Sequence, residues 1–257
     1  MSRNLQTLSS GTDKSPRVTQ ENPEAGEMTS LRQIKIRASA RLKNGRSDIG
    51  QWCAVSYPSR IAMEHPCIRL IRDEHISIAS ILTSILAMIQ RGPEDNAENF
   101  FDVLRAMLFY LDEFPARLHH PKESAYLFQP LRDKAAHLQD LLTRLETDHA
   151  REENAIRELQ HLLAAWEYLG TSRREAFEQQ AQRYVRFYRE HMQMEESILI
   201  PEAKKLLTDA QWRELDAQFE AHQDLFAANR PRDPAFDRLF TKIVMSAPAP
   251  IGLGRTH

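Results

Sequence analysis

Two copies of one short pattern, a His followed four residues later by a Glu, constrain this chain more than any other feature. The first copy is His119 and Glu123 in LHHPKESAYLFQP, and the second is His191 and Glu195 in RFYREHMQMEESILIP. In both copies apolar residues and then a proline follow the Glu. Because side chains four residues apart project from the same face of an α-helix, each pair presents an imidazole and a carboxylate together.

A lone His precedes each pair at nearly the same separation. His75 in RDEHISIA precedes the first pair, and His149 in ETDHAREE precedes the second. We interpret the chain as two helical hairpins, each of which offers one His from its first helix and a His/Glu pair from its second. Four helices in a bundle bring four such faces to one centre, as in the carboxylate di-metal bundles. We therefore predict a two-metal site inside a four-helix bundle.

The apolar residues support four long amphipathic helices, because they recur at every third or fourth position. We expect these helices at about 66–90, 96–128, 131–168 and 173–199. Pro115 and Pro121 should kink or briefly break the second helix, since each removes a backbone donor. The shared face of His119 and Glu123 depends on the chain staying roughly helical through Pro121.

The remaining segments complete an all-α fold: an up-down four-helix bundle with an additional C-terminal helix and a disordered N-terminal extension. Thr208 with Gln211 is a capping box that opens the fifth helix, and Asp233-Pro234 begins a last short one. We expect residues 1–62 to be a disordered basic and polar extension, or a segment that the native product lacks. The bundle with its fifth helix should cover 63–228, and a short helix with a flexible tail should cover 229–257.

Charge and composition argue against several classes of protein. The chain has 34 basic and 36 acidic residues, so it lacks the charge excess of a nucleic-acid-binding protein. No apolar run is long enough for a membrane span, and the N-terminus lacks a signal-peptide core. Cys53 and Cys67 have no metal-binding spacing and indicate no disulfide framework. We expect a cytoplasmic protein with no nucleic-acid or membrane partner.

Imidazoles and carboxylates on an apolar helix stripe are costly unless they are paired or bind a metal. A set of such ligands without a thiolate suits iron or manganese, with zinc also possible, and a carboxylate can bridge two ions. The candidate ligands are His75, His119, Glu123, His149, Glu153, His191 and Glu195. For Glu153 three roles remain open: metal ligand, hydrogen-bond partner of a ligand His, or member of a surface salt bridge.

Other polar residues near the pattern are expected to play no part in the site. His120 follows His119 and points about 100° away on a helix, so we expect it to be exposed. Tyr184 and Tyr188 are expected to pack in the core rather than to line an oxygen-binding pocket. We expect surface or ordinary positions for His65, His137, His161, Glu152, Glu190 and Glu196, and the role of His222 stays open.

These motifs identify a family that the chain resembles. They are RDEH at 72–75, HHPKE at 119–123, DHAREE at 148–153 and HMQMEE at 191–196, with LTDAQWRELDAQF at 207–219 behind them. In these motifs the chain resembles the bacterial hemerythrin-like proteins, also called the HHE cation-binding domain. The resemblance covers the chain from about Pro66 to Phe226, and its specificity lies in the combination of the motifs.

The resemblance implies a four-helix bundle that holds two non-haem iron ions, bridged by carboxylates and by an oxo or hydroxo group. By position, the terminal nitrogen ligands would be His75, His119, His149 and His191, and the bridging carboxylates would be Glu123 and Glu195. Oxygen-carrying hemerythrins have five His ligands, with an HxxxH pair on the third helix. This chain has His149 and Glu153 there, so it departs from the carrier pattern.

Three functions follow from these features. The first, which we favour, is a di-iron binding protein that binds or senses dioxygen, nitric oxide or iron. The second is a di-iron redox enzyme of the oxidase or peroxidase kind, or a protein that repairs iron–sulfur clusters under nitrosative or oxidative stress. The third is a helical scaffold in which the His/Glu pairs are ion pairs without a metal. Whether the protein is an enzyme stays open, although no feature of the sequence marks a substrate pocket.

Overall fold

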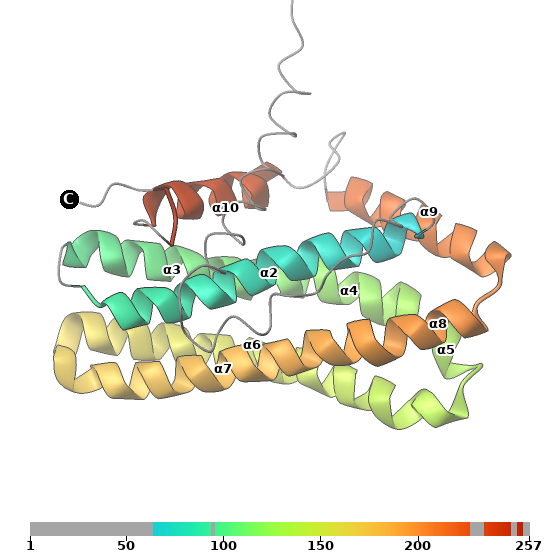
Figure 1. The fold of residues 1–257 in the computed structure, drawn as a ribbon, viewed down its shortest axis with the longest axis horizontal. Helices are drawn as coiled ribbons and strands as arrows, with labels where there is room; N and C mark the ends of the chain where they lie inside the picture. The colour runs from blue at the N-terminus through green and yellow to red at the C-terminus, as the bar shows by residue number, and fades with distance from the viewer. Residues whose placement is uncertain (1–63, 94–95, 227–233, 248–250, 254–257) are drawn as a thin grey trace, which may run out of the picture.

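Four helical rods lie side by side in the structure, a computed structural model that describes residues 64–93, 96–226, 234–247 and 251–253 (Figure 1). Turns at alternate ends of the bundle join successive rods, and the regular structure in the described residues is helical throughout, which confirms the predicted all-α up-down bundle. The rods are α2 (Pro66–Arg91), α3 to α5 (Ala97–Phe114, His120–Lys122 and Gln129–Arg132), α6 (Gln139–Leu169), and α7 with α8 (Arg174–Met194 and Ile200–Leu206).

Glycine and asparagine define the helix ends at one end of the bundle. Gly92 follows α2 with φ of 76°, and Gly170 follows α6 with φ of 94°, in the left-handed region that glycine enters without strain. The side chain of Asn96 accepts a 3.0 Å hydrogen bond from the backbone N–H of Asn99 and so caps α3. Gly92 and Gly170 therefore end α2 and α6 at the turns to the next rod.

The two rods that carry the His/Glu pairs contain π-helical turns. The second rod has one at Pro115–His119 and another at Glu123–Phe128, and the fourth has one at Glu195–Leu199. Such turns add one residue to a helical turn and are frequent at functional sites. The chain therefore remains helical through Pro121, as the shared face of the first pair requires, and it also continues past Pro201 to the end of α8.

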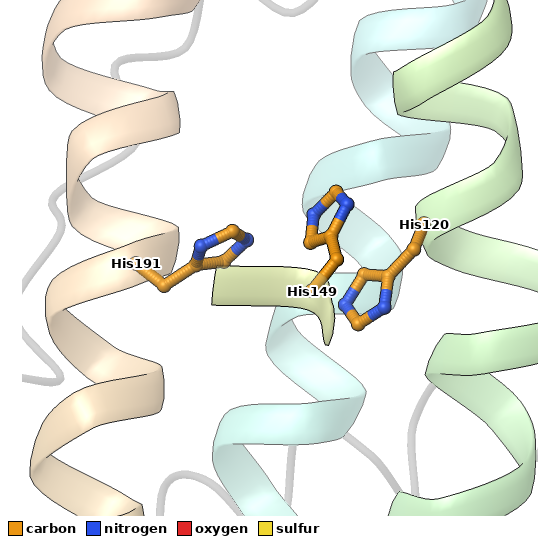
Figure 2. Close-up of side chains that lie close together, drawn as sticks. All are labelled: His120, His149 and His191. Carbon is orange, nitrogen blue, oxygen red and sulfur yellow. The ribbon is translucent and has the colours of Figure 1, made fainter. Parts of the chain in front are cut away.

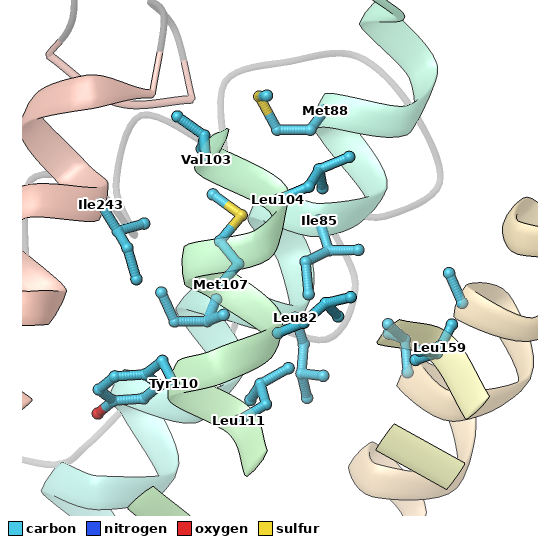
Figure 3. Packing of buried hydrophobic residues seen from close by; sticks show 14 of the residues in the cluster. Leu82, Ile85, Met88, Val103, Leu104, Met107, Tyr110, Leu111, Leu159 and Ile243 are labelled. Carbon is cyan, nitrogen blue, oxygen red and sulfur yellow. The ribbon is translucent and has the colours of Figure 1, made fainter. Parts of the chain in front are cut away.

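Two apolar cores fill the bundle and leave a polar layer between them. The first core packs α2 and α3 against α6 and α7, and Figure 3 shows part of it around Leu82, Leu104 and Leu159. The second core lies toward the other end of the bundle. In α2, Ile71 belongs to the second core and Ile78 to the first, so His75 lies between the two cores. This layered arrangement buries the polar residues as thoroughly as the apolar ones.

Two further helices cover the outside of the bundle. α9 (Asp209–Phe226) contributes Trp212 and Phe219 to the second core, and α10 (Pro234–Ser246) packs against α3 and contributes Ile243 to the first (Figures 1 and 3). The predicted capping box is present, because Thr208 and Gln211 exchange backbone-to-side-chain hydrogen bonds of 3.1 and 3.4 Å. Among the helices that the structure describes, none has the length and apolar character needed to cross a bilayer.

Some helix boundaries differ from the prediction. The third rod begins at Gln139 rather than near Leu131, because α5 ends at Arg132 and a 3₁₀ turn at Ala136–Leu138 follows it. Within the segment that was predicted as a tail, Ile251 is buried in the first core. The expected N-terminal extension, 1–62, lies outside the described residues.

Candidate metal centre

Six of the seven predicted ligands meet in the polar layer. The π turns place the two His/Glu pairs there, since His119 ends one turn and Glu123 and Glu195 each begin another. The six residues are His75 on α2, His119 and Glu123 on the second rod, His149 on α6, and His191 and Glu195 on the fourth rod.

Glu123 lies between imidazoles that come from three rods. Its Oε1 atom is 3.4 Å from Nε2 of His119 and 3.8 Å from Nε2 of His75. Its Oε2 atom is 3.7 Å from Nε2 of His149. One carboxylate therefore directs one oxygen toward His75 and His119 and the other toward the opposite side of the layer.

Glu195 makes the matching set of contacts. Its Oε2 atom is 3.2 Å from Nε2 of His75, and its Oε1 atom is 3.4 Å from Nε2 of His191. Two groups result, each of which shares both carboxylates and has its ligand atoms within 4.8 Å of one another. We call the group with His75 and His119 the first half, and the group with His149 and His191 the second half.

The inward-facing atoms of both halves lack hydrogen bonds. They are the Nε2 atoms of the four imidazoles and both carboxylate oxygens of Glu123 and Glu195, all of them buried. The distances or the angles between these atoms do not meet the geometry of a hydrogen bond. Buried polar atoms are normally satisfied, and a set left unsatisfied in one place calls for an ion or water. These four nitrogens and four carboxylate oxygens would suit two divalent cations that share the carboxylates of Glu123 and Glu195.

Outer partners hold three of the imidazoles by the nitrogen that faces away from the centre. The Nδ1 atom of His75 is 2.9 Å from Oε1 of Glu196, and that of His149 is 3.2 Å from Oγ of Ser124. The Nδ1 atom of His119 is 3.0 Å from Oε2 of Glu74. Such partners fix the tautomer and the ring orientation of a metal-binding His. Glu196 was expected to face solvent, and its contact with His75 corrects that expectation.

The structure does not bring Glu153, the seventh predicted ligand, to the centre. Its side chain is 51% exposed, and its carboxylate lies 3.3 Å from the guanidinium of Arg157 on the same helix. The preceding residue, Glu152, is buried instead and accepts a 3.0 Å hydrogen bond from the hydroxyl of Tyr184. The expectation that Glu152 faces solvent is therefore wrong.

His120 is also buried, contrary to the sequence expectation. Its ring stacks on the ring of His149 with centroids 3.9 Å apart, and Figure 2 shows both rings on one side of the gap that His191 faces. The Nε2 atom of His120 lies 3.1 Å from Oε2 of Glu152 and 3.2 Å from the hydroxyl of Tyr188. Tyr184 and Tyr188 thus pack in the core as expected, but their hydroxyls also support polar groups beside the centre.

The electrostatics differ between the imidazoles. Burial lowers the pKa of His191, but the charge of Glu195 and the nearby Asp148 outweigh burial and raise this pKa to about 10. Contacts with Glu123 and Glu195 likewise outweigh burial at His75 and raise its pKa well above the usual value. Burial and the neighbouring His120 lower the pKa of His149 to about 2, so His149 is neutral.

Several supporting residues were not found from the sequence. Glu74 and Lys122 are buried and paired with each other beside His119, and Asp148 lies 3.8 Å from Nδ1 of His191. Glu74 directly precedes His75 in the sequence, but consecutive side chains on a helix normally point in different directions. Its position therefore did not indicate a role in the site. The expected surface positions of His137 and His161 are confirmed, and the side chain of His222 lies outside the described residues.

A family model matches more than half of the chain. The model describes the hemerythrin HHE cation-binding domain, and it matches residues 67–203. The matched segment runs from the start of α2 into α8, and it includes all six residues that the centre brings together. Among curated proteins, none matches the chain.

Proposed function

The chain belongs to the hemerythrin HHE cation-binding domain family, and from this membership we propose that it holds two non-haem iron ions and binds a small diatomic ligand, dioxygen or nitric oxide. His75 and His119 would hold one ion, His149 and His191 the other, and Glu123 with Glu195 would bridge them. When bound, iron would supply the open coordination position and the change of oxidation state that binding such a ligand uses.

One observation carries this proposal: four imidazole nitrogens and four carboxylate oxygens face one another in the buried layer without hydrogen bonds. In a scaffold held only by ion pairs, His and Glu would satisfy each other directly, because an unsatisfied buried polar group costs about 1–3 kcal/mol. Outer acceptors that already hold the far nitrogens further favour metal ligands, since they leave the inward nitrogens for an ion.

Iron is proposed because the ligand set is mixed. Imidazole with carboxylate suits iron, whereas a thiolate-free set with this many carboxylate oxygens is less typical of structural zinc sites. The one cysteine that the structure describes as free, Cys67, is buried in the second core and is not part of the site. Manganese and zinc remain the competitors to test in metal loading.

Ligand titration tests the binding role. Iron-loaded, reduced protein is titrated anaerobically with nitric oxide and then, separately, with dioxygen, and the optical spectrum is followed. We expect saturation at a fixed ratio of ligand to protein, with no continued consumption when a reductant is added. Sustained dioxygen or peroxide consumption would instead support the redox enzyme. An unchanged spectrum with both gases would contradict the binding role.

A further inference from the structure

We propose that His120 is a fifth imidazole ligand of the centre and binds the ion in the second half together with His149 and His191. This inference rests on the proposed metal function and makes it more specific. The two ions would then differ, because the second half would offer three imidazoles and the first half two. Neither the family resemblance nor the four matched His residues assigns this role to His120.

The positions of the three rings carry the proposal. Each of the three imidazoles has one ring nitrogen that lies within 4.8 Å of a ring nitrogen of each of the other two, and the three residues are His120, His149 and His191. The rings come from three rods, and Figure 2 shows His120 and His149 facing His191 across one space. Metal–nitrogen bonds of about 2.0–2.1 Å hold the donors of one ion roughly 3–4 Å apart. A small movement of one ring therefore brings the three nitrogens to that separation.

The local helix geometry explains how two consecutive His residues both face the interior. In a regular α-helix, His119 and His120 would point about 100° apart, and one of them would leave the layer. Here the π turn Pro115–His119 ends between them and a further π turn begins at Glu123. These turns change the direction of successive side chains, and both rings are buried, with centroids 5.4 Å apart.

The neighbours of His120 allow it to turn toward an ion. A buried carboxylate, Glu152, lies 3.1 Å from its Nε2 atom, whereas Glu74 and Glu196 contact the Nδ1 atoms of His119 and His75. The hydroxyl of Tyr184 holds Glu152 independently at 3.0 Å. If His120 turns to an ion through Nε2, Glu152 therefore keeps a hydrogen-bond partner.

Glu153 was the sequence candidate for the additional ligand, and its solvent-facing position leaves that role to another residue. His120 reaches the same half of the centre from the second rod. A third imidazole favours nitrogen-preferring cations such as Zn²⁺ or Fe²⁺ in the second half over an oxygen-preferring cation such as Mn²⁺. The two halves should therefore load in sequence rather than together.

Cobalt(II) titration of the metal-free protein tests this inference, because Co²⁺ reports its ligands through its visible spectrum. The wild type should take up two Co²⁺ in separable steps. His120→Gln, whose amide keeps a polar group beside Glu152, should weaken one step about 10–100-fold and change its spectrum, while the other step is unaltered. His137→Gln removes an exposed His on the surface, and it should match the wild type in both steps.

A second measurement does not depend on a variant that folds. Proton NMR of the Co²⁺-loaded wild type counts the exchangeable imidazole N–H signals that the ion shifts, one for each bound His. We expect five such signals. Four signals, or an H120Q titration identical to the wild type, would overturn the role of His120 and leave the di-metal function intact. A wild type that takes up no Co²⁺ would overturn both.

Discussion

The Nδ1 atom of His119 lies 3.0 Å from Oε2 of Glu74, a residue 45 positions earlier in the chain. The other carboxylate oxygen of Glu74 accepts a hydrogen bond from the ammonium of Lys122, and all three side chains are buried. The charge of Lys122 and the bond to His119 overcome burial and lower the pKa of Glu74 to about 2. These three side chains form a triad that supports the first half of the centre from outside.

This triad predicts that Lys122→Met strongly destabilises the protein. The substitution leaves the Glu74 carboxylate buried without its cation, and breaking a buried ion pair in this way costs about 3–5 kcal/mol. The free energy of unfolding, measured by urea denaturation, checks the value. Lys205→Met is the control, because Lys205 pairs with Glu202 at the surface and its loss should cost less than about 0.5 kcal/mol. Equal losses in the two variants would contradict the buried triad.

The raised pKa of His191 predicts that metal affinity depends on pH. The metal-free protein keeps His191 protonated up to about pH 10, and an ion binds only the neutral ring. Affinity should therefore fall as the pH is lowered, by roughly tenfold per pH unit for each proton displaced. His75 should add a second proton, whereas the neutral His149 should add none.

Competition with a chelator at pH 6.5, 7.5 and 8.5 measures this dependence for Zn²⁺. Proton release can be followed in the same samples with a weakly buffered indicator dye. An affinity that stays constant over this range, with no proton release, would show that the two imidazoles are already neutral in the metal-free protein.

Metal should also stabilise the fold, since the unsatisfied atoms of the layer belong to the folded state only. At a free ion concentration of 100 times Kd, the gain is about 2.7 kcal/mol, which corresponds to a rise in Tm of roughly 5–10 °C. Thermal unfolding with and without a chelator checks this rise. The variant His119→Ala with His191→Ala should show no difference between the two conditions, and a similar rise in that variant would place the bound ion elsewhere.

Glu152 and Glu153 provide a matched pair of substitutions. Glu152→Gln should cost about 1–3 kcal/mol, because an amide cannot keep both the hydrogen bond from Tyr184 and the 3.1 Å ion-pair contact with His120. Glu153→Gln should cost less than about 1 kcal/mol, since it loses only the exposed pair with Arg157. Thermal unfolding of both variants distinguishes them, and the reverse order would refute the assignment of Glu152 to the interior.

The sequence predicted the bundle well because its helices are long and strongly periodic, and the paired motif placed six residues of the centre. It failed where the register along a helix changes. On α6 the buried positions run through Leu145, Asp148, Glu152 and Ile156, in steps of three and four. A step of four back from Ile156 reaches Glu152, whereas a step of three reaches Glu153, so the steps alone do not separate the two residues. The sequence interpretation followed His149 to Glu153, although His149 lies at the edge of the stripe.

The pattern of apolar residues in the sequence did not predict the π turns. A template of 3.6 residues per turn places His120 outside the bundle, and only the added residue of each π turn brings it inward. The prolines at 115 and 121 marked an irregularity in the second rod, but not the direction in which it turns the side chains. Contacts such as that between Glu74 and Lys122 join different rods, so no local pattern indicates them.

Metal analysis of protein purified from iron-supplemented cells tests the central claim most directly. Iron and zinc are counted per chain for the wild type, for His137→Ala and for His119→Ala with His191→Ala. Two iron ions per chain in the first two proteins, and background iron in the third, are the predicted result. Equal metal content in all three proteins, or no metal in the wild type under any loading condition, would contradict a metal centre between Glu123 and Glu195.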